Sequence, residues 1–152
     1  MQPMQTLLVP LDTSVSAAKV LSRAESLAKS LPAKLVLFHV IEPIATYVPV
    51  GAGMDVVATS PQAINVEETD DSQKRLEMLA APLRAAGLDV ACEVAIGLAV
   101  DAILEQAKAL PADYIVLGSH GHGALYHLFS GSVVTGVLQH STCPVVVVPV
   151  RG

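Results

Sequence analysis

The chain has 152 residues, a length that suits one domain able to bury a core without disulfides or metal ions. Its residues are 52% hydrophobic, 3% aromatic and 15% charged, which predicts an aliphatic core in a single soluble domain spanning residues 1–152. The formal net charge of −5 argues against a nucleic-acid-binding protein, because such proteins concentrate lysine and arginine on one face.

The first part of the chain predicts a strand, a helix and a second strand. Residues 6–11 form a short apolar run that ends at Asp12, where the start of a helix is expected. Apolar residues at helical spacing follow from Ala17, and Pro32 ends this helix. Residues 34–41 are almost continuously apolar, as in a strand buried on both faces, so His39 is expected to be a core histidine whose polar atoms are satisfied.

The middle of the chain predicts a connection and a helix. Residues 42–66 hold prolines and glycines without a clean period, which favours a long irregular surface connection, placed where it could gate a site. Acidic residues then begin a helix that Gly87 ends. Pro82 lies inside this helix, and the sequence leaves open whether it kinks the helix or splits it.

The last part of the chain alternates strands and helices. Residues 90–96 predict a strand, residues 100–107 a helix and residues 113–117 a strand that runs into Gly118. A helix begins at Ser132, and residues 145–148 form the last strand. This order predicts an α/β fold, an open five-stranded parallel sheet with helices on both faces.

A glycine-rich segment between the last two strands predicts an anion site. Three glycines in residues 118–123 allow a ligand to approach the backbone, and Gly131-Ser132 opens a helix whose free N–H groups attract anions. The alternative is a tight turn after a strand. No lysine or arginine lies between Lys108 and Arg151, so an anion must be held by backbone amides, hydroxyls, histidines or a metal ion. Ser132-Val133 stands where a Walker loop needs lysine.

Asp12 is expected to share one crevice with this segment if the first and fourth strands are neighbours, because ligands bind at the carboxyl ends of strands where the winding reverses. Asp12 could serve as a helix N-cap or contact the bound ligand. His120, His122 and His127 lack a nearby carboxylate or thiolate ligand, so no metal site built from protein side chains is predicted. His140 is expected to interact with the negative end of the last helix.

The cysteines favour a reducing compartment. Cys92 and Cys143 are far apart in sequence and lack redox or metal-ligand spacing, so buried free thiols are expected. The first residues lack a positive region typical of secretion signals, and no apolar run approaches the roughly 18 residues of a membrane span. We therefore expect a cytoplasmic protein without a membrane partner.

Five short segments occur in order along nearly the whole chain. They are Leu8-Val9-Pro10-Leu11-Asp12, Leu37-Phe38-His39-Val40, residues 115–121, Gly131-Ser132-Val133 and residues 143–147. Gly118, Gly121, Gly131 and Ser132 follow the spacing glycine, two residues, glycine, nine residues, glycine, then serine. On these residues the chain resembles the universal stress proteins, in particular their ATP-binding branch.

The resemblance implies a Rossmann-like, adenine nucleotide alpha hydrolase-like sheet in the order 3-2-1-4-5, with ATP at the carboxyl ends of strands 1 and 4. Asp12 and Pro10 would lie by the adenosine, and the backbone of Val40 would contact the adenine edge. The implied nucleotide-binding residues are Pro10, Leu11, Asp12, Val40, Gly118, Ser119, His120, Gly121, His122, Gly123, Gly131, Ser132, Val133 and Val134.

One departure from the family concerns charge. His122-Gly123 stands where family members often carry a basic residue, so the phosphates of ATP would depend on Mg²⁺ and backbone dipoles, and AMP or ADP competes as the ligand. The segment offers no group suited to rapid hydrolysis, so catalytic residues are not predicted and ATPase turnover should be slow at most.

The last strand is expected at an exposed sheet edge. Its residues, Val145, Val146, Val147 and Val148, are apolar, and pairing with a second copy would cover them; the resemblance implies the same homodimer. The leading hypothesis is a nucleotide-binding module that acts in the stress response. The alternatives are a nucleotide-free homodimeric scaffold and a small enzyme for another adenylated substrate.

Overall fold

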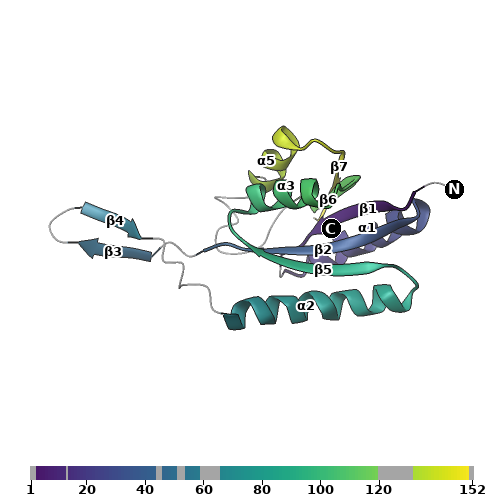
Figure 1. The fold of residues 1–152 in the computed structure, drawn as a ribbon, viewed down its shortest axis with the longest axis horizontal. Coiled ribbons are helices and arrows are strands. Elements are labelled where there is room, and N and C mark those ends of the chain that lie inside the picture. The colour runs from purple at the N-terminus through teal and green to yellow at the C-terminus, as the bar shows by residue number, and fades with distance from the viewer. Residues whose placement is uncertain are drawn as a thin grey trace.

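A parallel sheet of five strands forms the centre of the fold in the computed structural model, which describes residues 3–12, 14–43, 46–50, 54–58, 66–119 and 132–150 (Figure 1). Its strands are β1 (Gln5–Pro10), β2 (Ala33–Ile41), β5 (Val90–Ile96), β6 (Tyr114–Gly118) and β7 (Val145–Val148). Their order is β5-β2-β1-β6-β7 and every pairing is parallel. The order 3-2-1-4-5 that the family resemblance implies is confirmed.

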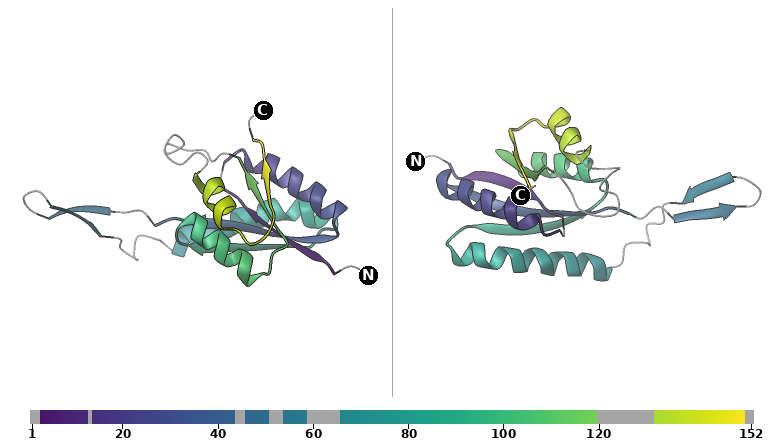
Figure 2. Two further views of the ribbon diagram at one scale, coloured as in Figure 1. Left: turned by 90° about the horizontal axis from the view of Figure 1, so that it is seen from above. Right: turned by 180° about the vertical axis from the view of Figure 1, so that it is seen from behind.

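Helices cover both faces of this sheet. They are α1 (Ala17–Ser30), α2 (Val66–Ala85), α3 (Ala99–Ala109) and α5 (Ser132–His140). Figure 2 shows α1 and α2 on one face and α3 and α5 on the other, and the two hydrophobic clusters of the core contain the same helix pairs. Successive residues of β1 serve both clusters: Leu7 and Val9 face α1 and α2, while Leu8 faces α3. A central strand covered on both sides therefore reads as an unbroken apolar run.

Residues 46–50 and 54–58 form a pair of strands, here called the hairpin, that the sequence did not predict. β3 (Thr46–Val50) pairs antiparallel with β4 (Met54–Ala58), where an irregular connection was expected. Pro49 lies within β3 and removes one N–H donor, which argues against a strand when only the sequence is read. In a sheet of two strands each strand has a free edge, so a proline is tolerated there.

Pro82 does not split α2, which runs as one helix from Val66 to Ala85. Pro82 is exposed and lies in the last turn of α2. Helical hydrogen bonding continues past it, since Ala86 N–H donates to Pro82 O at 3.1 Å. Because α2 ends three residues later, the single lost N–H weakens only the C-terminal turn. Of the two outcomes that the sequence left open, splitting of the helix is therefore excluded.

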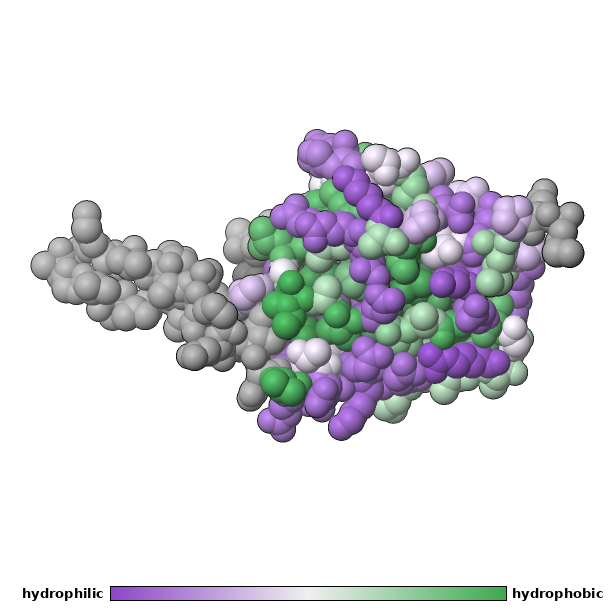
Figure 3. Space-filling model, in the orientation of Figure 1, coloured by the Kyte–Doolittle hydropathy of each residue, from purple (hydrophilic) through white to green (hydrophobic). Residues whose placement is uncertain are grey.

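Side chains of α2 occupy the outer edge of β5. Leu35 N–H of β2 donates to Asp89 O, so the peptide groups of Asp89 face β2. Because successive residues of a strand point their peptide groups to alternate sides, the carbonyls of Val90 and Cys92 point away from β2. Arg84 donates to Val90 O through Nε at 2.9 Å and Nη2 at 2.7 Å, and Gln73 Nε2 donates to Cys92 O at 3.1 Å. Figure 3 shows apolar residues in the band between the polar outer surfaces of α3 and α2.

Within the ranges that the structure describes, no helix combines the length and apolar character that crossing a bilayer requires.

Candidate functional site

The carboxyl ends of the parallel strands bring distant segments together. β1 and β6 are hydrogen-bonded neighbours, and the chain winds from β1 toward β5 on one side and from β6 to β7 on the other. The winding therefore reverses between β1 and β6, which is the place where open α/β sheets bind ligands. Asp12 follows β1 and Gly118 ends β6, so the topology behind the predicted crevice is present.

Asp12 forms a turn before α1 and is not its N-cap. Its Oδ1 accepts a hydrogen bond from Ser14 N–H at 3.0 Å and another from the Ser14 hydroxyl. The helix begins at Ala17, with Ser16 in the N-cap position. The N-cap role that the sequence left open is therefore wrong, and Asp12 lies exposed in an Asx turn at the carboxyl edge.

Leu11, just before Asp12, is held by β2 through both of its peptide groups. Leu11 N–H donates to Phe38 O at 2.8 Å, and His39 Nδ1 lies 2.7 Å from Leu11 O. A carbonyl oxygen only accepts, so Nδ1 carries the proton and donates. The expectation that His39 is satisfied is confirmed, and its partner lies inside the candidate site.

The main chain of Val40 faces the end of β1. Gly97 N–H donates to Ile41 O at 3.0 Å, so the peptide groups of His39 and Ile41 face β5 and those of Val40 face the opposite side. The pairing of β1 with β2 ends at Pro10 and Phe38. The half-buried side chain of Val40 packs against the cluster that contains α3, while its backbone faces the switch point.

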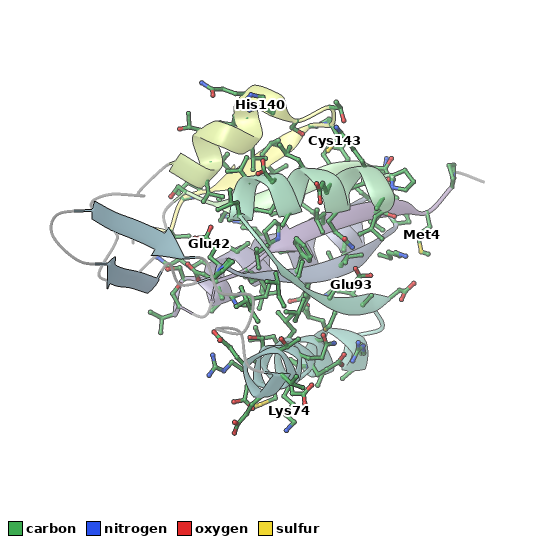
Figure 4. All side chains as sticks on the ribbon, turned by 60° about the vertical axis from the view of Figure 1, so that its left-hand side comes forward. Met4, Glu42, Lys74, Glu93, His140 and Cys143 are labelled. Carbon is green, nitrogen blue, oxygen red and sulfur yellow. The ribbon has the colours of Figure 1, made fainter. Side chains whose placement is uncertain are left out.

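Glu42 is a residue of this edge that the sequence analysis missed. Its Oε1 accepts a hydrogen bond from Ala99 N–H, the first residue of α3, at 3.0 Å, and Figure 4 shows Glu42 at this end of the molecule. The carboxylate compensates the positive end of α3. Its position directly after β2 was the available signal, because the carboxyl ends of parallel strands meet at one edge.

The helix that follows the glycine-rich segment has no such compensation. α5 carries no acidic residue in its first turn, and the sequence contains no Asp or Glu after Asp113. The first turn of α2, by contrast, holds Glu67 and Glu68. The absence of a carboxylate from its own first turn leaves the start of α5 more favourable for an external anion than the start of α2.

Ser119 uses its polar groups within the protein. Its N–H donates to Val148 O at 2.9 Å, and its hydroxyl accepts from Val150 N–H at 3.2 Å. These bonds join the end of β6 to the chain after β7. Ser119, predicted to bind nucleotide, therefore also has a structural role, whereas Val133 and Val134 are half-buried against the cluster that contains α3.

Part of the predicted site lies outside the described residues. This applies to His120, Gly121, His122, Gly123 and Gly131, and also to His127. Ser132 is the first residue of α5. Within the described ranges, no group of three or more His, Cys, Asp or Glu side chains is arranged to hold a metal ion.

Comparison with known families gives one clear match. The model of the family described as "Universal stress protein family" matches residues 4–149. Universal stress protein A homolog 2 of Coxiella burnetii is 31% identical over 135 residues, covering 88% of this chain and 86% of its own length. Universal stress protein YxiE of Bacillus subtilis is 33% identical over 143 residues, covering 93% and 97%.

Solved structures share the fold. UspA from Lactobacillus plantarum has a TM-score of 0.77 and 23% identity, covering 97% of this chain and 99% of its own. A universal stress protein in complex with cAMP has a TM-score of 0.69 and 24% identity, covering 99% and 100%. A universal stress protein from Archaeoglobus fulgidus in complex with dAMP has a TM-score of 0.68 and 18% identity, covering 97% and 99%.

Proposed function

The chain belongs to the universal stress protein family, and from this premise we propose that it is an adenine-nucleotide-binding module of the stress response. The observation that carries the proposal is the edge where β1 and β6 end side by side. Asp12, the backbone of Val40 and the start of α5 all belong to that edge. Relatives of the same fold form complexes with cAMP and dAMP, which share an adenine base and one phosphate.

The proposed site divides the nucleotide between two kinds of contact. Val40 main-chain groups pair with the adenine edge, and the Asp12 carboxylate accepts hydrogen bonds from the ribose. The residues from Gly118 to Gly123 and from Gly131 to Val134 take the phosphates, largely through backbone N–H groups. Pro10 and Leu11 complete the adenosine side.

The number of phosphates on the bound nucleotide depends on the positive charge available at the site. No lysine or arginine lies between Lys108 and Arg151, so ATP binds with Mg²⁺, and AMP or ADP competes where the metal ion is scarce. The same lack of a lysine or arginine in this segment limits hydrolysis, because phosphoryl transfer needs more of the developing charge stabilised than a bound metal ion alone provides. Turnover is therefore slow at most, and the module acts by being loaded or empty.

Mass spectrometry of ligand released from freshly purified, denatured protein is the first test, followed by calorimetric titration of AMP, ADP and Mg-ATP. Asp12→Asn keeps the Oδ1 acceptor of the turn but removes the charge, and should weaken binding on the order of tenfold. Asp89→Asn is the matched control, because Asp89 is exposed and precedes β5 at the opposite edge. Absence of both released nucleotide and binding would refute the proposal.

We further propose that two copies pair through β7. β7 is an edge strand, Val147 is 36% exposed, and the strand is wholly apolar. Ser119 N–H bonds to Val148 O, so the N–H of Val147 points away from β6 and is available to a partner strand.

The pairing can be tested by removing this N–H group. Val147→Pro should convert a dimer into a folded monomer, measured by light scattering and circular dichroism. Val147→Thr keeps the N–H and the branched side chain and serves as the control. A dimer that survives the proline substitution contradicts this interface.

Two broader assignments accompany the proposal. The family match from residue 4 to residue 149 supports one universal stress protein domain for the whole chain. Cys92 and Cys143 are free, as expected, but half-buried where full burial was predicted; free thiols suit a reducing cytoplasm.

A further inference from the structure

The ladder between β1 and β2 is interrupted where the two strands approach the candidate site. The strands pair in register from Gln5 and Ala33 to Pro10 and Phe38, and the bond from Leu11 N–H to Phe38 O continues this pattern. In a parallel ladder the next rung would run from Val40 N–H to Leu11 O. Among the hydrogen bonds between described residues that rung is replaced: Leu11 O receives the Nδ1–H of His39 at 2.7 Å.

The replacement of this backbone rung by the His39 bond has two consequences for the backbone. The peptide groups on both sides of Leu11 are held by β2, so the chain leaves the sheet at a fixed angle into the Asx turn of Asp12. The N–H of Val40 is not used for Leu11 O and still faces the side of β1, where β1 has already turned away. The His39 ring thus influences both the turn that carries Asp12 and the main chain of Val40.

We propose that His39 is a positioning residue of the nucleotide site: its Nδ1–H takes the Leu11 carbonyl, which fixes the turn that carries Asp12 and leaves Val40 N–H for the adenine edge. The inference rests on the proposed function for its ligand. Its structural half, the placement of the turn by the ring, does not depend on any ligand. His39 is not expected to touch the nucleotide.

The position of the donating nitrogen allows a sharp test by substitution. In asparagine the amide nitrogen is two bonds from Cβ, as Nδ1 is, whereas in glutamine it is three bonds away, as Nε2 is. His39→Asn can therefore donate to Leu11 O, and His39→Gln loses this bond. Both variants lose the packing of the ring, so a purely structural role predicts similar losses in the two.

The control uses a second histidine with the same kind of contact. His140 Nδ1 lies 3.0 Å from Gly136 O, and His140 is exposed in the last turn of α5, away from the carboxyl edge (Figure 4). His140→Gln removes an imidazole contact with a main-chain carbonyl without affecting the turn at Asp12. It should bind AMP and Mg-ATP like the unmodified chain.

Two readouts separate the inference from the proposed function. In the free protein, hydrogen exchange of Ser14 N–H, which donates to Asp12 Oδ1, should accelerate on the order of tenfold in His39→Gln and stay near its original rate in His39→Asn. In titrations with AMP and Mg-ATP, His39→Gln should bind about tenfold more weakly and His39→Asn within about threefold of the unmodified chain.

Each outcome decides one of the two ideas. If the unmodified chain and His140→Gln bind no adenine nucleotide, the proposed function fails, and the nucleotide half of the inference fails with it. Equal Ser14 exchange in both His39 variants would overturn the placement of the turn by His39. Equal affinities in both His39 variants, or losses that only follow their thermal midpoints, would overturn its effect on binding.

Discussion

Gly136 of α5 packs closely on Val100 of α3, and replacing this glycine by alanine should destabilise the protein. A Cβ atom at this position would lie 2.8 Å from Val100 Cγ2 and 3.1 Å from Val100 Cγ1. Both methyl groups of one side chain face the added atom. Valine in a helix strongly prefers one rotamer, so rotation of Val100 is a costly escape, and the two helices must move apart.

The expected magnitude follows from two opposing effects. Overpacking of this kind costs about 1–3 kcal/mol. Alanine is about 1 kcal/mol better than glycine inside a helix, which offsets part of that cost. The free energy of unfolding should therefore fall by about 1 kcal/mol.

Urea unfolding followed by circular dichroism measures this change. The double variant Gly136→Ala/Val100→Ala provides the sharper test, because removing the two methyl groups relieves the clash. It should be more stable than the sum of the two single changes by about 2 kcal/mol, the overpacking cost that is relieved, a coupling expected of residues in contact. A Gly136→Ala protein that is more stable than the unmodified chain, or strict additivity, would refute the reasoning.

Two further predictions concern single side chains. Burial raises the pKa of the Cys92 thiol to about 11 from the ordinary 9.0, and the nearby Glu77 charge adds to this effect. In a Cys143→Ala background, maleimide should therefore label Cys92 at pH 8 about 100-fold more slowly in the folded than in the unfolded chain. Because the folded chain holds the thiol proton of Cys92 more tightly than the unfolded chain, the free energy of unfolding should fall as pH rises from about 9 to 11. Cys92→Ala should remove this pH dependence, and a pH dependence that persists in Cys92→Ala would contradict the raised pKa. Glu42→Leu should lower the free energy of unfolding, measured in urea, by about 1 kcal/mol, because Ala99 N–H loses its acceptor. Glu42→Gln keeps an acceptor oxygen and should lose about half as much. Stabilities of both variants equal to that of the unmodified chain would contradict the capping role.

The five-stranded sheet could be predicted because its strands are buried on both faces. Leu7, Leu8 and Val9 are fully buried, so the run reads as apolar without alternation, and the same holds for residues 35–38 of β2. The hairpin of β3 and β4 gives no comparable signal, since Pro49 interrupts its first strand and glycines follow it. The pattern of apolar residues therefore predicted the five-stranded sheet, which helices cover on both faces, and did not predict the two-stranded sheet of β3 and β4.

The site was predictable to the level of its strand ends. Asp12 and Gly118 were expected to share one crevice if the first and fourth strands were neighbours, an order that the family resemblance implied, and β1 and β6 are neighbours. The contacts that shape the edge escaped prediction, because they join residues distant in sequence. Glu42 reaches Ala99 across 57 residues and His39 reaches Leu11 across 28, and no spacing rule in the sequence connects such pairs.

The cover that α2 gives to β5 limits how this protein can assemble. Arg84 and Gln73 already occupy the outward carbonyls of Val90 and Cys92, so another strand cannot add there without displacing them. Growth of the sheet is thus hindered at β5 and less hindered at β7. Two copies joined there would present a covered β5 at both outer edges, and polymerisation into a fibre would stop at the pair.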